Sequence, residues 1–136
     1  MIAIQKELGI RTGTRSQMID ITGQVASMVA KSGICDGDVV VFCPHTTAAV
    51  TINENADPDV VHDVLLTLSD VLPQGRPGYR HNEGNSDAHC KSSLVGCSVQ
   101  VLVQDGRLRL GTWQAIYFCE FDGPRPREVL VQIRGE

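Results

Sequence analysis

The chain has 136 residues, of which 42% are hydrophobic and 21% charged, and its net charge is −4. This length and composition predict a single domain, residues 1–136, with one core, and they exclude a disordered chain. The negative charge and the lack of a basic run argue against nucleic acid as a partner. No apolar run approaches the length of about 20 residues that a membrane span needs. Polar and acidic side chains at the start of the chain do not fit a signal peptide, so we expect a cytoplasmic protein with no membrane partner.

The first part of the chain predicts strands around one helix. Residues 2–10 mix apolar and polar positions, as an edge strand does. Apolar residues at helical spacing follow Thr22, a candidate N-cap, and stop before Gly33, which suits the position after a helix. Residues 39–42 form a continuous apolar run typical of a buried strand, and residues 48–52 indicate another short strand.

Two helices are expected in the middle of the chain. Asp57 followed by Pro58 is typical of a helix start, and apolar residues with helical period come after it. His62 falls within this helix and is expected on its surface. Ser86 or Asp87 is a candidate cap for a short third helix that ends before glycine.

The last third of the chain reads as strands. Valines alternate over residues 99–103, and Asp105-Gly106 is a strong hairpin signal. Further strands are expected over 116–120 and 129–133, and Trp113 is expected in the core. This mixed order predicts an α+β fold, a layered β-sheet sandwich with two or three helices, and not a repeating βαβ unit.

A polar cluster within the run HNEGNSDAH is the strongest functional signal. Five side chains that can bind a metal or transfer a proton occupy every second position: His81, Glu83, Asn85, Asp87 and His89. They would share one face if the run were extended, but the glycine and the expected helix cap within it argue against full extension. A solvated polar loop is the alternative interpretation.

His45 follows the expected buried strand and could join His81 and His89. Three histidine nitrogens with an open fourth position are typical of catalytic zinc, which polarises a substrate oxygen or activates water. Glu83 or Glu54 would then act as general acid or base. The alternative for His45 is a structural histidine bonded to the backbone.

Several other polar residues are candidates for binding an anionic substrate. Threonine hydroxyls and helix N-termini both donate hydrogen bonds to anions. Asp57 is already explained as a helix cap, although the two roles are compatible. Scattered surface charge is the alternative for the basic residues. The candidates are Thr46, Thr47, Asn53, Asp57, Asn85, Lys91, Gln114, Arg76, Arg80 and Arg125.

The five cysteines are odd in number, widely spaced and without a CxxC motif. In a cytoplasmic chain this pattern predicts free thiols that pack as small hydrophobic residues.

Several ordered motifs resemble those of the YjbQ family, whose members are often labelled secondary thiamine-phosphate synthases. The motifs are His45-Thr46-Thr47-Ala48-Ala49, residues 51–58, residues 81–89 with 91–94, Gly111-Thr112-Trp113-Gln114 and Asp122-Gly123-Pro124-Arg125. They span nearly the whole chain. Cys90 and Cys97 depart from the expected pattern without touching the polar motifs.

The resemblance implies an α+β fold and a homotrimer with a polar pocket near a subunit boundary. It also implies zinc at His45, His81 and His89, and thiamine-phosphate synthesis as a candidate activity. That reaction usually needs Mg²⁺ and oxygen ligands, whereas histidines suit zinc better. We therefore expect a small metal-assisted enzyme that acts on a phosphorylated or anionic small molecule. The alternatives are a trimeric module that binds a metabolite or anion and a metal without turnover, and histidines that only stabilise a trimer interface.

Overall fold

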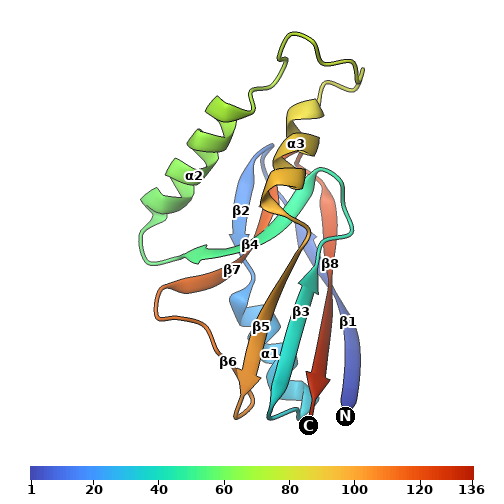
Figure 1. Cartoon of the computed structure of the whole chain (residues 1–136), viewed down its shortest axis with the longest axis vertical. Helices are drawn as coiled ribbons and strands as arrows, with labels where there is room; N and C mark the ends of the chain where they lie inside the picture. The colour runs from blue at the N-terminus through green and yellow to red at the C-terminus, as the bar shows by residue number, and fades with distance from the viewer.

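The computed structural model describes all residues, 1–136, and contains two antiparallel sheets and three helices (Figure 1). The five-stranded sheet has the order β1 (Ile2–Arg11), β8 (Pro126–Gly135), β3 (Gly37–Phe42), β5 (Ser98–Gln104) and β6 (Arg107–Leu108). The three-stranded sheet has the order β2 (Gln17–Asp20), β7 (Gln114–Glu120) and β4 (Ala48–Glu54). The helices are α1 (Thr22–Ser32), α2 (Pro58–Val71) and α3 (Ser86–Val95). The predicted α+β class is confirmed.

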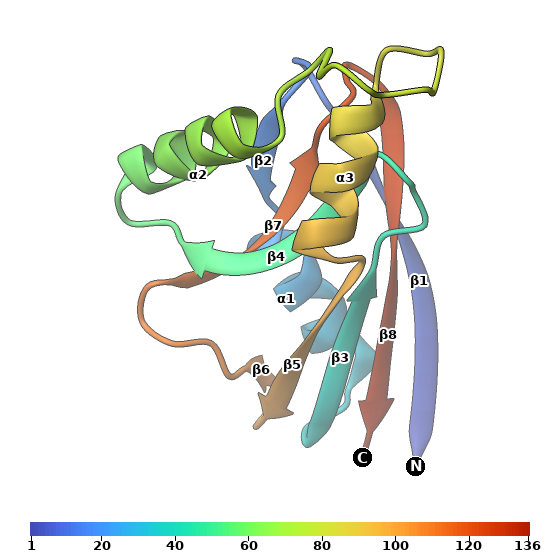
Figure 2. The same cartoon turned by 45° about the horizontal axis from the view of Figure 1, so that its top comes forward.

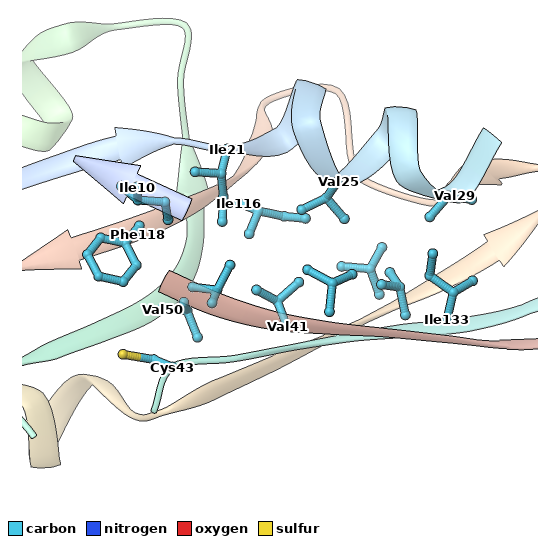
Figure 3. Packing of buried hydrophobic residues seen from close by; sticks show 14 of the residues in the cluster. Ile10, Ile21, Val25, Val29, Val41, Cys43, Val50, Ile116, Phe118 and Ile133 are labelled. Carbon is cyan, nitrogen blue, oxygen red and sulfur yellow. The ribbon is translucent and has the colours of Figure 1, made fainter. Parts of the chain in front are cut away.

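The main core lies between the five-stranded sheet and a layer formed by α1 and the three-stranded sheet (Figure 3). Val25 and Val29 of α1 and Phe118 of β7 are fully buried there against Val41 and Ile133 of the larger sheet. Each such side chain contributes roughly 1.5–3 kcal/mol through its burial. The polar residues described below lie where strands of both sheets begin or end.

The outer face of the three-stranded sheet is covered by α2 and α3 (Figure 2). Six consecutive residues of β7, Ala115–Glu120, are buried because both faces of this central strand are covered. Even-numbered residues of this run face the main core, and odd-numbered ones face the helices. Glu120 therefore points toward the main core, although its side chain is ionisable.

Two helix starts differ by one residue from the expectation. Asp57 caps α2 as predicted, with its Oδ1 accepting a hydrogen bond of 2.9 Å from the Asp59 N–H. The N-cap of α1 is Ile21 and not Thr22, whose Oγ1 accepts a hydrogen bond from the Ile116 N–H instead. The N-cap of α3 is Asn85 and not Ser86 or Asp87.

Gly33 ends α1 in the left-handed conformation at φ 75°, as its position predicts. The turn at Asp105 and Gly106 joins β5 to β6, as the hairpin signal predicted. Strand β2 was not predicted, because its four residues are too few to show a period. The expectation that Trp113 lies in the core is wrong: it is 61% exposed in the loop before β7.

No helix in the structure has both the length and the apolar character needed to cross a membrane. All five cysteines are free thiols. Only Cys43 and Cys119 are buried as the sequence predicted, whereas Cys35 and Cys97 are exposed.

Candidate functional site: a polar pocket at one end of the sheets

Three connections meet at the end of the molecule where α3 begins: the β3–β4 loop, the residues before α3, and the β7–β8 loop (Figures 1 and 2). They enclose a pocket of about 270 Å³. All lining residues except Pro44 carry polar side chains. The lining consists of Pro44, His45, Thr46, Thr47, Glu83, Asn85, His89, Asp122, Arg125 and Arg127. We call this the polar pocket.

A buried ion pair supports the floor of the polar pocket: Arg127 lines the pocket, and the fully buried Glu120 lies behind it. Arg127 Nε donates to Glu120 Oε1 at 2.8 Å, and its Nη2 donates to Glu120 Oε2 and to Thr47 Oγ1. Thr12 Oγ1 and the backbone N–H groups of Phe121 and Asp122 also donate to the Glu120 carboxylate. Burial alone would raise the pKa of Glu120, but these hydrogen bonds and the Arg127 charge outweigh it and lower the pKa. Glu120 is therefore a carboxylate at neutral pH.

Arg127 still has donors to offer. Its Nη1 makes no hydrogen bond within the protein, and this nitrogen is not among the enclosed atoms that lack a partner. Nη1 is therefore accessible, on a residue that lines the polar pocket. Arg125 is placed similarly at the rim: its Nε and Nη2 donate to Asp122, and its Nη1 is uncommitted.

The β7–β8 loop brings Asp122 and Arg125 to the pocket through a tight turn at Gly123. The Gly123 Cα lies so close to the Thr14 carbonyl and the Glu120 side chain that a Cβ would clash with both. Asn85 Nδ2 donates to Asp122 Oδ2 at 2.7 Å. This bond ties the start of α3 to the β7–β8 loop.

His45 is held by the backbone of β8. Its Nε2 lies 3.0 Å from the N and 3.1 Å from the O of Glu128, so the tautomer decides whether Nε2 accepts from one or donates to the other. Nδ1 makes no hydrogen bond within the protein. Burial, together with the positive charge of Arg127, lowers the pKa of His45. The imidazole is therefore neutral at pH 7, and Nδ1 can accept or donate a proton.

His81 and His89 are close to each other, but the three histidines do not form a metal-binding group. Their ring centroids are 5.4 Å apart with the rings nearly perpendicular, and His81 Nε2 lies 3.5 Å from Glu83 Oε2. His81 lines a neighbouring hollow with Tyr79, and His89 lines both that hollow and the polar pocket.

The three histidines, as placed in this chain, do not form a zinc site. Zinc needs three or four ligand atoms about 2.0–2.3 Å from one point. No group of three or more His, Cys, Asp or Glu side chains meets that requirement. The expectation that His45, His81 and His89 hold one metal therefore finds no assembled ligand set in the protomer.

Lys91 lies in a buried charge cluster and not in the polar pocket. Its Nζ donates to Asp87 Oδ2 at 2.9 Å, and Arg15 binds the same carboxylate with two hydrogen bonds of 3.0 Å. Burial alone would raise the pKa of Asp87, but the hydrogen bonds and charges of Arg15 and Lys91 outweigh it and lower the pKa. This cluster fixes the first turns of α3.

Four predicted site residues lie at the opposite end of the three-stranded sheet. Asn53 and Glu54 end β4, and Glu54 pairs in register with Gln114, which begins β7. Gln114 Oε1 accepts from the Gly111 N–H, and Asn53 Oδ1 accepts from the Glu54 N–H. Asp57 caps α2. The structure therefore does not bring Glu54 to the histidines within one chain.

The sequence analysis did not single out the ion pair behind the pocket, which consists of Arg127, a lining residue, and the fully buried Glu120. A signal was present, because Glu120 continues the inward-facing series of Ile116 and Phe118 along β7. Arg127 likewise precedes the inward series of alternate apolar residues in β8. Opposite charges at inward positions of two strands indicate a buried ion pair.

The sequence and the fold are those of a YjbQ-like protein. A family model described as UPF0047 protein YjbQ-like matches residues 6–136. The UPF0047 protein YugU of Bacillus subtilis is 53% identical over 96% of this chain and 98% of its own. A UPF0047 protein of Methanocaldococcus jannaschii is 52% identical over 93% of this chain and 91% of its own. The chain therefore belongs to the YjbQ (UPF0047) family.

Solved structures agree with this assignment. A YjbQ/UPF0047-family protein of Clostridium acetobutylicum superposes with a TM-score of 0.92 at 55% identity, covering 95% of this chain and 99% of that one. A protein of Sulfolobus solfataricus gives a TM-score of 0.94 at 33% identity over 99% of both chains. The layered arrangement described above is thus the family fold.

Proposed function

We propose that this chain is a small enzyme that acts on a phosphorylated or otherwise anionic small molecule in the polar pocket. The observation that carries the proposal is the combination of uncommitted N–H groups on Arg127 with the neutral imidazole of His45 in one pocket. The first can bind an anion, and the second can move a proton.

The anionic group would bind at the arginines. Guanidinium groups recognise phosphate and carboxylate through several parallel N–H donors. Arg125 and Arg127 each keep Nη1 free, and Thr47 Oγ1 accepts from Arg127, which leaves the Thr47 hydroxyl proton to donate. Buried Glu120 holds Arg127 in place, so little ordering is needed when the anion binds.

Proton transfer would fall to His45, with Glu83 as a second acid or base. A neutral imidazole at pH 7 is suited to general base catalysis, and Nδ1 of His45 is uncommitted. Glu83 is exposed, lines the pocket and has only His81 as an ionic neighbour. Glu54 has no part in this proposal. No step is assigned to a divalent metal, because the histidines do not form a ligand set.

Thiamine-phosphate synthesis, which the family resemblance implied, is the named candidate reaction. It would join a pyrimidine diphosphate to a thiazole phosphate and release pyrophosphate. Its test is an assay with both substrates and Mg²⁺, comparing the wild type with His45→Gln. Turnover that does not depend on His45 would assign this reaction to another site or to a contaminant.

The second candidate is a binding module without turnover. It is favoured by the carboxylates of Glu120 and Asp122, which are satisfied by protein donors, as those of a pure binder should be. Glu83 is the exception, since no protein donor saturates it.

We also propose that the chain forms the homotrimer that the resemblance implied, and that it works in the cytoplasm. Helix α2 has an apolar stripe but no buried residue, and Leu66, Val71, Leu94 and Trp113 are each more than half exposed. Apolar exposure of this kind supports self-association. Sedimentation equilibrium measures the mass directly, and a monomer at micromolar concentration would contradict the trimer.

The enzyme and the binder are separated by one set of experiments. Binding of ethyl phosphate is measured by calorimetry, and turnover of a panel of phosphorylated metabolites is followed by ³¹P NMR. We expect Arg125→Ala to weaken binding at least tenfold and His45→Gln to abolish turnover, with Glu54→Gln as the unaffected control. Binding without any turnover would favour the module, and neither binding nor turnover would overturn both.

A further inference from the structure

We infer that the ligand of the polar pocket carries one oxyanion group and, at its other end, a hydrogen-bond donor such as an amino or hydroxyl group. This inference rests on the proposed function, because it assumes that the pocket binds an anion. It follows from the Glu83 carboxylate, a hydrogen-bond acceptor that lines the same pocket as the arginine donors.

The pocket has little net positive charge to offer a polyanion. The charge of Arg127 is offset by Glu120, and that of Arg125 by Asp122, at hydrogen-bond distance. Glu83 adds an uncompensated carboxylate, and the His45 imidazole is neutral. A diphosphate would therefore meet a nearly neutral site, whereas a single oxyanion can use the free Nη1 groups.

One acceptor in the wall is available to a donor on the ligand. The Glu83 carboxylate lines the pocket, its side chain is 66% exposed, and it is contacted only by His81 at 3.5 Å. A donor on a bound ligand can take the place of the water that solvates this carboxylate. Asn85 does not add a second acceptor, because its Oδ1 is enclosed by the protein and its Nδ2 donates to Asp122.

The size of the pocket limits how far apart the two groups can be. A volume of about 270 Å³ corresponds to roughly nine water molecules at about 30 Å³ each. A phosphoryl group with a two-carbon arm and a terminal donor fits this space. The ligand is thus a small amino- or hydroxy-substituted oxyanion and not a diphosphate ester. The inference therefore counts against thiamine-phosphate synthesis, whose pyrimidine substrate is a diphosphate, as the reaction of this pocket.

The test compares three probes that share a phosphoryl group: ethyl phosphate, 2-hydroxyethyl phosphate and O-phosphoethanolamine. We expect both donor-bearing probes to bind wild-type protein about tenfold more tightly than ethyl phosphate in calorimetry, as one hydrogen bond to a charged acceptor would give. Glu83→Ala should reduce this preference to less than about threefold, and ethyl phosphate should bind no more weakly than to the wild type, because the change removes a carboxylate that repels the oxyanion. Glu7→Ala removes an exposed carboxylate from β1, outside the pocket, and should keep the full preference.

Each other outcome has a defined meaning. Equal binding of all three probes, or an unchanged preference in Glu83→Ala, would overturn the inference and leave the anion site intact. A gain for O-phosphoethanolamine alone would show a preference for positive charge and not for a donor, which also overturns it. If no probe binds and Arg125→Ala behaves as the wild type, the proposed function itself fails.

Discussion

The two ends of strand β4 carry similar polar residues in different surroundings. At its start, His45 and Thr47 face a pocket backed by the buried carboxylate of Glu120. At its end, Asn53 and Glu54 lie near the surface, and their bonds are local to the turn. The comparison teaches that residue type alone does not make a site. Buried charges that hold a donor toward a pocket distinguish the first end from the second.

The largest effect is expected from Glu120→Ala at the supported end. This change leaves the Arg127 guanidinium buried without its carboxylate, which typically costs about 3–5 kcal/mol. Urea denaturation should show a loss of this size in the free energy of unfolding. Asp38→Ala, which breaks the more exposed ion pair with Arg134, is the matched control and should shift the midpoint little. Equal effects of the two changes would remove the special status of the pocket floor.

A smaller loss is expected from Lys91→Met. Lys91 is 4% exposed and bonds to Asp87, which keeps Arg15 as a partner after the change. We expect a loss of about 1–3 kcal/mol in unfolding free energy and no change in ethyl phosphate affinity. Weaker phosphate binding at unchanged stability would instead return Lys91 to the substrate-binding role that its sequence position suggested.

The sequence was sufficient for what depends on local pattern. The caps at Asp57 and Gly33, the hairpin at Asp105 and a strand before His45 follow from spacing and turn chemistry, and the structure has them. That strand is buried on one face only, because Val39 and Val41 are buried whereas Phe42 is 39% exposed. It also placed His45, Thr47, Glu83, Asn85 and His89 among the site candidates, and all five line one pocket.

The sequence was not sufficient for what depends on pairing between distant strands. Glu54 and His45 are nine positions apart, yet a seven-residue strand places them at opposite ends of a sheet. Arg127 and Glu120 meet only because β7 and β8 belong to different sheets that face one core. Lys91 looked like a surface cation because its partner Asp87 belongs to a buried cluster that is completed by Arg15, which is distant in the chain.

A pH-dependent effect is expected from His45. Its pKa is lowered in the folded chain, so the unfolded chain takes up the proton first as the pH falls. Stability should therefore be complete above the ordinary histidine pKa of about 6.5 and decrease as the pH falls through and below it. The carboxylates of Asp87 and Glu120 also stabilise the fold, but their contribution is lost only at lower pH, because their pKa values are lowered from 3.8 and 4.5.

Thermal unfolding of wild type and His45→Gln at about pH 7.5 and about pH 5.5 measures this contribution. Between the higher and the lower pH, the Tm of the wild type should fall by a few degrees more than the Tm of His45→Gln. The size follows because 1 kcal/mol corresponds to about 2–8 °C in domains of this size range. A difference that does not change with pH would mean that His45 is not held in its neutral form by the fold.

No effect on the pocket is expected from Glu54→Gln at the unsupported end of β4. The Glu54 side chain makes no ion pair, and the residue is tied to the fold through its backbone carbonyl, which accepts from Tyr117 Oη at 2.9 Å. The substitution keeps the shape of the side chain and this bond, so ethyl phosphate affinity and unfolding free energy should match the wild type in calorimetry and urea denaturation.

A loss of turnover or binding at unchanged stability would contradict this prediction. It would mean that Glu54 acts in the polar pocket, although within one chain it lies at the other end of the sheet. Only a second copy of the chain could bring it there, and adding an excess of His45→Gln subunits, which retain Glu54, should then restore activity to Glu54→Gln in mixed oligomers. Such rescue would join the two ends of β4 into one shared site, whereas the absence of any effect keeps them separate.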